Sequence, residues 1–364
     1  MRRPFINKLD WYIIKKFIGT FFFTILIVIL VIIIFDLSEK IDYFVNNEVS
    51  LKEIVFDYYC SFIPWMLNSF GPLFVFVAAI FFTSQMASHS EIVAILSSGV
   101  SYKRLLAPYM MSATIIATIY LLMGMFVIPP ADRTRIDFED KYIKAHKTAS
   151  SEREIHYQIA PGEFVYVEQF SPWANTAYRF TLETIDSGEI KSKLSAETAA
   201  WDSTFCGWKL RNWIRRDYYG ESEMVSTGRY CDTVINLTIE DFYRRDNIVE
   251  TLPQKELNAL IEMQMMRGDD MIKYALIEKN NRIATPFSAF ILTIMAVSLS
   301  SRKKRGGIGI NIGVGLALSF SYILFQRFSQ MFVFTGTLSP ALALWLPNIL
   351  YAGIAVVLYK MAQK

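Results

Sequence analysis

Cysteine and histidine are scarce in this chain, with three of each among 364 residues. Three cysteines are too few for a disulfide framework, and we expect Cys206 and Cys231 to be free thiols, with a single bridge between them as the alternative. The histidines stand alone, without Cys or carboxylate at ligand spacing, so neither a metal site nor another cofactor is expected. The sequence also lacks a G-x-S-x-G turn and a G-x-x-x-x-G-K-[ST] phosphate loop. We therefore expect no catalytic residues and no ATP hydrolysis by this chain itself.

Charge is close to balance, since 37 Lys and Arg residues are offset by 34 Asp and Glu residues. The net charge of +3 gives no electrostatic reason to expect a nucleic-acid partner. Long apolar runs, in contrast, are abundant, and residues 17–35 carry no charge over 19 positions. At about 1.5 Å of rise per residue, such a helix is long enough to cross the hydrocarbon core of a bilayer.

Comparable uncharged stretches predict six membrane spans, three before residue 132 and three after residue 282. Their ranges are 17–35, 58–88 (a span with its exit), 105–131, 283–301, 306–326 and 328–359. The last of them begins with a short turn around 336–340. Thirteen Lys and Arg residues lie on the side of the N-terminus, against only Lys40 and Lys52 in the short loops opposite. Because Lys and Arg are retained in the cytoplasm, both termini are predicted to be cytoplasmic and the polar middle region to lie outside.

The middle region is predicted to form strands. Short alternating runs at 163–170, 178–185 and 208–219 are separated by turns that contain Gly, a pattern typical of an antiparallel sheet with one buried face. Six to eight such runs predict a sandwich or jellyroll, whose edge strands another sheet can extend. Aromatic residues on strands are more often core than ligand groove, and we expect core positions for Trp173, Trp201, Trp208 and Trp213.

The fold class that follows is an α-helical membrane protein with six transmembrane helices, three plus three, and an inserted all-β, jellyroll-like periplasmic domain. The expected units are residues 1–131, which hold spans 1 to 3, residues 132–280, which hold the all-β domain, and residues 281–364, which hold spans 4 to 6. Helices at 132–147 and 254–267 are expected to join the domain to spans 3 and 4.

The loop between spans 2 and 3 combines helix signals with an apolar stripe. An amphipathic helix is predicted over about 88–98, closed by Gly99 as its C-terminal cap, with Glu91 as its only acidic residue. The helix has no Lys or Arg, which disfavours a position on the membrane surface and favours a groove on a soluble partner. The residues assigned to this contact are Ser90, Glu91, Ile92, Val93, Ile95, Leu96 and Gly99.

Five segments together resemble the LptF/LptG permeases of the lipopolysaccharide export ABC transporter. They are LDWYIIKKFIGTFF at 9–22, SEIV-x5-GVS at 90–101, EFVYVEQF at 163–170, NRIATPFSAF at 281–290 and SPALALWLPNILY at 339–351. Their order follows the three-plus-three layout over the whole chain, and the LDWY and FVYVE segments are closer to the LptG half.

This resemblance implies a bacterial inner-membrane permease subunit that extracts lipopolysaccharide from the outer leaflet and passes it to a periplasmic jellyroll bridge. It implies as partners a cytoplasmic ABC ATPase dimer, a second LptF/LptG-type permease and periplasmic jellyroll proteins of the LptC/LptA type. Glu91 and its neighbours then form a coupling helix that docks on the ATPase. The faces of spans 1 and 5 form the gate through which the lipid leaves the bilayer.

The outer ends of spans 1 and 5 hold the candidate lipid contacts, Asp36, Lys40, Gln326 and Arg327. LptG-type chains present lysines to lipid phosphates at the end of span 1, whereas here Lys40 stands alone among acidic residues. Arg327 is expected at a similar depth on span 5. There it binds lipid phosphate, pairs with Asp36, or extends to the interface.

Two other classes of function remain open. A membrane enzyme that modifies lipids requires a polar catalytic cluster, for which Asp36, Asp57 and Arg327 are available, but no His or acid pair accompanies them. A mechanotransmission ABC permease also has a large outside domain. Permeases of that type resemble four-span chains in which the outside domain follows span 1. Here the outside domain follows span 3 of six, which argues against this class.

Overall fold

The computed structural model describes residues 7–143, 153–186, 188–220, 222–242, 248–269, 271–301 and 307–363. These residues divide into two compact units. The helical unit comprises Met1–Phe138, Glu250–Gln254 and Leu276–Lys364, and the sheet unit comprises Glu139–Val249 and Lys255–Ala275.

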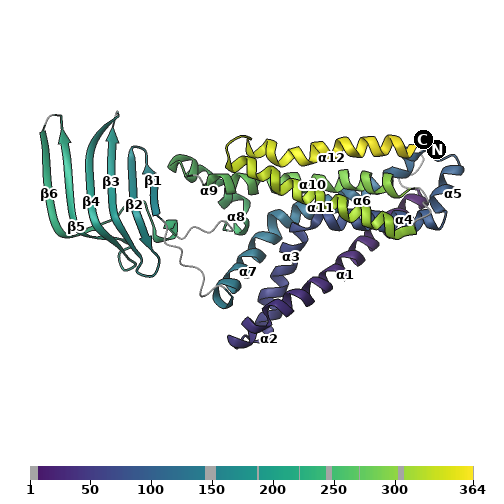
Figure 1. The fold of residues 1–364 in the computed structure, drawn as a ribbon, viewed down its shortest axis with the longest axis horizontal. Coiled ribbons are helices and arrows are strands. Elements are labelled where there is room, and N and C mark those ends of the chain that lie inside the picture. The colour runs from purple at the N-terminus through teal and green to yellow at the C-terminus, as the bar shows by residue number, and fades with distance from the viewer. Residues whose placement is uncertain are drawn as a thin grey trace. The chain divides into compact units, whose positions relative to one another are not determined.

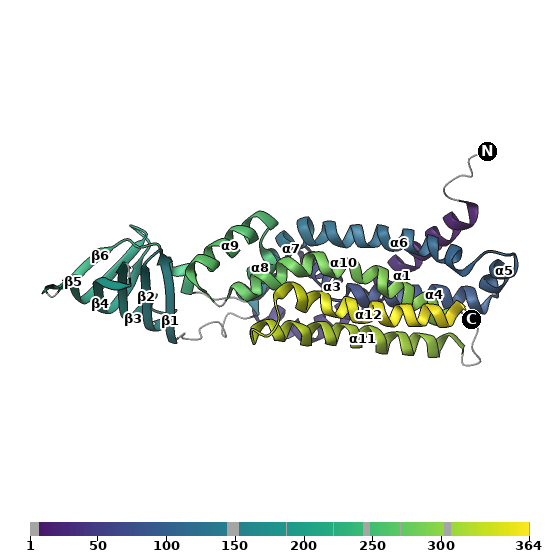
Figure 2. The same cartoon turned by 90° about the horizontal axis from the view of Figure 1, so that it is seen from above.

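Helices precede and follow the sheet in the chain (Figures 1 and 2). Before the sheet come α1 (Lys8–Asn46), α2 (Leu51–Glu53), the π-helix η1 (Ile54–Tyr59), α3 (Cys60–Ser69), α4 (Gly71–Ser88), α5 (Glu91–Ser97), α6 (Tyr102–Leu122), the π-helix η2 (Met123–Val127) and α7 (Ile128–Tyr142). After it come the 3-10 turn η3 (Ile239–Phe242), α8 (Ile248–Thr251), α9 (Gln254–Arg267), α10 (Ile272–Ser300), α11 (Gly307–Phe334) and α12 (Pro340–Gln363).

Six helical stretches in the described residues are long and apolar enough to cross a membrane, namely those of α1, α4, α6 to α7, α10, α11 and α12. The predicted six spans are confirmed.

The second predicted span is divided into two helices. Phe70 leaves helical geometry at φ −110° and ψ 14°, and Pro72 in the first turn of α4 favours a new helix start. Gly71 allows α4 to approach α6 closely here, because a Cβ atom at this position would lie 2.8 Å from a ring carbon of Tyr120. The stretch that can cross the membrane is therefore Gly71–Ser88.

Span 5 ends later than the predicted residue 326, while the turn predicted around 336–340 separates the last two spans. Helix α11 continues through Phe334, and α12 begins at Pro340 after a turn in which Gly336 has φ +74°. The Ser339 side chain accepts a hydrogen bond from the Leu342 backbone N–H at 3.4 Å, as an N-terminal cap does. Arg327 consequently lies about 10 Å before the end of α11 rather than at that end.

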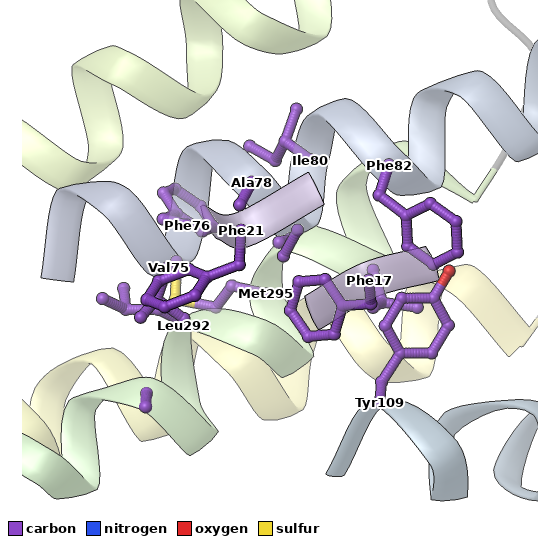
Figure 3. Packing of buried hydrophobic residues seen from close by; sticks show 14 of the residues in the cluster. Phe17, Phe21, Val75, Phe76, Ala78, Ile80, Phe82, Tyr109, Leu292 and Met295 are labelled. Carbon is purple, nitrogen blue, oxygen red and sulfur yellow. The ribbon is translucent and has the colours of Figure 1, made fainter. Parts of the chain in front are cut away.

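Helix α4 forms the centre of the helical unit. Within the chain, 72% of its apolar stretch is buried, against 11% of that of α1. Phe82 of α4 stacks on Phe17 of α1 at 6.0 Å between ring centroids, and the Tyr109 ring of α6 contacts both (Figure 3). Between Phe21 and Phe44 no residue of α1 is buried. The middle of α1 is therefore available to lipid or to another chain.

The sheet unit contains one antiparallel sheet (Figure 1). Its strands are β1 (Arg153–Ala160), β2 (Glu163–Ser171), β3 (Thr176–Asp186), β4 (Glu189–Asp202), β5 (Gly207–Tyr219) and β6 (Ser222–Thr233), and each pairs with the next. The predicted all-β insertion is confirmed. In the described residues the strands form a single meander instead of two facing sheets, because consecutive strands are joined by short turns.

One face of the sheet carries the apolar core. Val167 of β2 lies opposite Phe180 of β3, and both are buried. Trp208 is fully buried and donates its indole N–H to the Leu237 carbonyl at 2.8 Å. Trp201 and Trp213 pack against the same core, as predicted, whereas Trp173 is 81% exposed and the core prediction for it is wrong.

Trp213 packs over β6 at Gly228. A Cβ atom on Gly228 would lie 2.7 Å from the indole nitrogen, so only Gly allows this contact. Cys206 and Cys231 are free thiols, as predicted.

The two helices predicted beside the sheet are present. Helix α9 has the bounds that the sequence predicts, Gln254–Arg267. Helix α7 covers Ile128–Tyr142 and so begins before the predicted residue 132, while predicted residues 144–147 lie outside the described residues.

Candidate functional site

The predicted loop helix is present as α5 but is shorter than expected. Helix α4 extends through Ser88, Ser90 adopts a left-handed conformation with φ 62°, and α5 covers only Glu91–Ser97. Gly99 follows the helix with φ +89°, a conformation that favours Gly and agrees with its predicted capping role.

The apolar stripe of α5 faces its own helical unit. Ile92 is buried in the main core, and Ile95 and Leu96 pack against that core. Val93 is instead 58% exposed, and Ala94 and Ser97 are exposed beside it. A soluble partner would therefore meet the face of α5 that carries Val93, Ala94 and Ser97.

Glu91 joins α5 to the first turns of α1. The Tyr12 hydroxyl donates a hydrogen bond to Glu91 Oε2 at 3.1 Å, and Lys16 Nζ donates to the Tyr12 oxygen at 2.9 Å. Lys16 Nζ also lies 3.9 Å from Glu91 Oε1, as does His89 Nδ1. The sequence does not predict Tyr12 and Lys16 as partners of Glu91. Their i, i+4 spacing places them on one helix face, but nothing local relates them to a residue so distant in the chain.

A second ion pair holds the same end of α1. Arg104 on α6 approaches Asp10 Oδ2 to 2.6 Å, and Asp10 accepts a hydrogen bond from the Asn7 backbone N–H at 2.8 Å. Only 4% of the Asp10 side chain is exposed. The first turns of α1 are therefore connected by polar contacts both to α5 and to α6.

Lys40 is already paired within the chain. Its ammonium lies 2.8 Å from Asp36 Oδ1 and 4.7 Å from the centroid of the Tyr58 ring, and it donates a hydrogen bond to the Tyr58 hydroxyl. The Tyr58 hydroxyl donates in turn to Asp36 at 3.1 Å. The pairing of Asp36 with Arg327 that the sequence allowed is thus replaced by the nearer i, i+4 pairing with Lys40.

Gln326 and Arg327 lie at a different place, in a small polar cavity of the helical unit. Gln326 donates to Asn281 Oδ1 at 3.0 Å, and both Glu250 and Glu278 line the cavity beside Arg327. The structure therefore separates the four predicted lipid contacts into an Asp36–Lys40 pair and a Gln326–Arg327 pair. Glu250 and Glu278 were not singled out from the sequence, because only the fold brings these acids from α8 and α10 next to α11.

Arg282 on α10 holds the segment after α8 against the helical unit. Its guanidinium forms an ion pair with Glu278 at 2.7 Å and donates to the Leu252 carbonyl at 2.9 Å and to Gln254 Oε1 at 3.4 Å. The side chain is 3% exposed. One buried cation thus links α10 to two residues of a segment that is distant in sequence.

Burial raises the pKa of the Glu250 carboxyl to about 7. The carboxylates of Glu278 on α10 and Asp132 on α7 raise it too, while Arg135 on α7 and Arg327 on α11 lower it. In the unfolded chain the ordinary value is 4.5, so the native state holds this proton more tightly. The contribution to stability is then complete below pH 4.5 and declines as the pH rises through about 7.

We expect the thermal stability of the purified chain in detergent to fall between pH 5 and pH 8, by about 1–2 kcal/mol from Glu250, after allowance for its half-buried position. This corresponds to about 2–8 °C in Tm. Glu250→Gln should remove that part of the pH dependence, whereas Glu256→Gln, at an exposed carboxyl on α9, should not. Identical pH profiles for the unmodified chain and Glu250→Gln would refute the assignment.

The sheet offers two further surfaces. Among the described strands, β1 and β6 each have a neighbour on one side only. On the apolar face, Phe242 stacks on Phe170 at 4.5 Å and, with Leu237, covers one end of the sheet. Leu182 and Leu194, which lie opposite each other towards the other end, are only partly buried.

Among the described residues, no group of three or more His, Cys, Asp or Glu side chains is placed to hold a metal ion. Asp36 and Arg327, proposed together as part of an enzymatic cluster, are held by different neighbours.

Comparison with known proteins agrees with this architecture. Residues 11–361 match the model of a family described as lipopolysaccharide export system permease LptF/LptG. Comparison with curated protein sequences gave no match. The matched range includes candidate spans on both sides of the sheet and the whole sheet itself, so the match is not a general likeness between apolar helices. The chain is a multi-pass membrane protein and belongs to the LptF/LptG family of lipopolysaccharide export system permeases.

Proposed function

We propose that this chain is a permease subunit of an ABC transporter that extracts lipopolysaccharide from the outer leaflet of the inner membrane and passes it to a periplasmic jellyroll bridge. A separate cytoplasmic ATPase dimer powers the transport, and a second LptF/LptG-type permease completes the membrane part. The observation that carries this proposal is the family match across both the spans and the inserted sheet. The closer likeness to the LptG half stays a prediction.

The excess of Lys and Arg near both chain ends supports an orientation with cytoplasmic termini and a periplasmic sheet unit. In that orientation α5 lies on the cytoplasmic side, where an ATPase binds. Its outward face, with Val93, Ala94 and Ser97, supplies a small exposed contact surface. Glu91 then transmits ATPase movement to α1 through its contacts with Tyr12 and Lys16.

The lipid is proposed to leave the bilayer along α1 and α11. No residue of α1 between Phe21 and Phe44 is buried by its own chain, and Phe328 on α11 is 65% exposed. Of the predicted lipid contacts, Lys40 is largely neutralised by Asp36, so Arg327 with Gln326 is the better candidate for lipid phosphate. A charge-assisted bond from a guanidinium to phosphate is stronger than a neutral one.

The sheet is proposed to receive the acyl chains on its apolar face and to continue edge to edge into partner jellyroll proteins of the LptC/LptA type. Among the described strands, β1 and β6 have a neighbour on one side only, which supports this continuation, since an edge strand is a template for another sheet. The partly buried pair of Leu182 and Leu194 supports a lipid-binding face, because it adds apolar surface beyond the covered core.

Site-specific photo-crosslinking of the assembled transporter tests the proposal. Crosslinkers at Leu182 and Leu194, and at Phe328 on α11, are expected to capture lipopolysaccharide in an ATP-dependent manner. Matched positions on the opposite face of the sheet, Thr181 and Ser195, pair with each other in the same two strands and serve as controls. Equal capture on both faces, or none at Leu182, Leu194 and Phe328 in an active complex, would contradict the proposed path.

A further inference from the structure

A groove of about 600 Å³ lies between α1 and α4 near the first turns of α1. Its α1 wall contains Lys15, Gly19 and Phe23, which follow one another at i, i+4 spacing and so lie on one helix face. Phe81 and Gln85 of α4 form the other wall. The groove is basic at the Lys15 end and largely apolar towards Phe23 and Phe81.

Gly19 keeps the groove open. Phe17 and Phe21, on either side of Gly19 in sequence, point into the core of the helical unit and are buried. At Gly19 itself, apart from its chain neighbours and the backbone of its own helix, no heavy atom lies within 4 Å of the position that a Cβ atom would occupy. A long apolar chain can therefore lie against the backbone of α1 at this point without moving any protein side chain.

The charge at the basic end is unbalanced. The Lys16 ammonium lies within ion-pair distance of Glu91 and donates a hydrogen bond to the Tyr12 hydroxyl. Lys15 is exposed, and no carboxylate in the described part of the chain lies within ion-pair distance of its ammonium. Trp11, which is 61% exposed, lies close by in the sequence and is typical of a helix segment at the membrane interface.

We propose that this groove is a binding site for an anionic glycerophospholipid. Its phosphate pairs with Lys15, and one acyl chain lies along Gly19, Phe23 and Phe81. The charge complementarity favours a lipid over a neutral protein helix, because a cation at a membrane surface attracts anionic headgroups while the apolar walls bury a hydrocarbon chain. The site lies at the opposite end of α1 from Asp36 and Lys40, so it is distinct from the proposed export path and does not depend on it.

Native mass spectrometry of the full chain in detergent, titrated with phosphatidylglycerol and with phosphatidylcholine, tests this inference. The unmodified chain is expected to bind phosphatidylglycerol more tightly. Lys15→Ala should weaken that binding about fivefold, the effect of one interfacial cation. Lys360→Ala removes an exposed lysine of α12 that does not line the groove, and should leave the binding unchanged.

Gly19→Leu provides an independent test of the acyl-chain position. The added side chain meets open space and suits a helix, so the fold should be kept, while the retention of both lipids should fall by at least about threefold. Soluble glycerol phosphate, which has no acyl chain, should not displace the lipid. The inference is overturned if both variants bind phosphatidylglycerol as tightly as the unmodified chain does. It is also overturned if glycerol phosphate displaces the lipid completely.

Discussion

Replacing Glu91 with Lys is expected to weaken binding of the ATPase by about 100-fold or more and to abolish export, while the chain stays in the membrane. In the unmodified chain the Glu91 carboxylate accepts a hydrogen bond from Tyr12 and lies beside Lys16 and His89. A lysine here removes the acceptor and places a second positive charge beside Lys16 of the same chain. The repulsion is expected to move α5 out of the position in which its exposed face meets the ATPase. Co-purification of the ATPase and ATP hydrolysis by the reconstituted complex measure the effect.

Two milder variants separate direct contact from transmission through α1. Glu91→Gln keeps an acceptor for the Tyr12 hydroxyl, and Tyr12→Phe removes the link to α1 while leaving the carboxylate intact. If Glu91 acts through α1, Tyr12→Phe should keep the ATPase bound but reduce export by several-fold. Normal export with a bound ATPase in Glu91→Lys would show that α5 is not the coupling element.

Replacing Arg282 with Ala is expected to destabilise the helical unit by about 3–5 kcal/mol, because it leaves the Glu278 carboxylate buried without its ion-pair partner. The same change removes the donors to the Leu252 carbonyl and to Gln254, so the segment after α8 is released from α10. The expected fall in Tm of the purified chain is about 6–20 °C.

A double variant distinguishes loss of the ion pair from loss of packing. Arg282→Met combined with Glu278→Leu removes both charges and keeps apolar volume, and should recover most of the lost stability, since replacement of a buried pair by apolar residues is often neutral. Lys279→Ala on α10, at a residue only partly buried, serves as a control and should change Tm by less than about 2 °C. A Tm for Arg282→Ala equal to that of the control would show that the pair does not stabilise the unit.

Much of the architecture could be predicted because the signals are local. A membrane span is an uncharged run of fixed minimum length, so the six spans were found even though no residue contacts were known. Alternation of apolar and polar residues between Gly-containing turns predicts the strands at 163–170 and 208–219. The sequence also predicts both ends of α9 correctly. Element ends depend on more than the local pattern. At Phe70–Gly71, where the second span divides, Pro72 is a local signal for a new helix start, whereas the close approach of Gly71 to Tyr120 is a tertiary contact.

The candidate sites were predicted in part. Glu91 and Arg327 were singled out because charged residues are conspicuous in apolar surroundings. Their partners were not, because Tyr12 and Lys16 are far from Glu91 in sequence, and Glu250 and Glu278 come from separate elements. The apolar stripe on α5 predicts a partner surface, but Ile92, Ile95 and Leu96 pack on the core of this chain. An amphipathic pattern indicates that one face of a helix is buried, but not which surface buries it.

By itself, the sequence determined the membrane class, the three-plus-three arrangement, the inserted antiparallel sheet and the likeness to its family, all of which depend on composition, periodicity and motif order along the chain. Only the tertiary structure decided which charges are paired. It joined Lys40 to Asp36, Glu91 to Tyr12 and Lys16, and Arg282 to the segment after α8, and it left Lys15 beside an open groove. Side-chain pairing depends on distances of a few ångströms between elements, and those distances are set by how helices pack rather than by where residues stand in the chain.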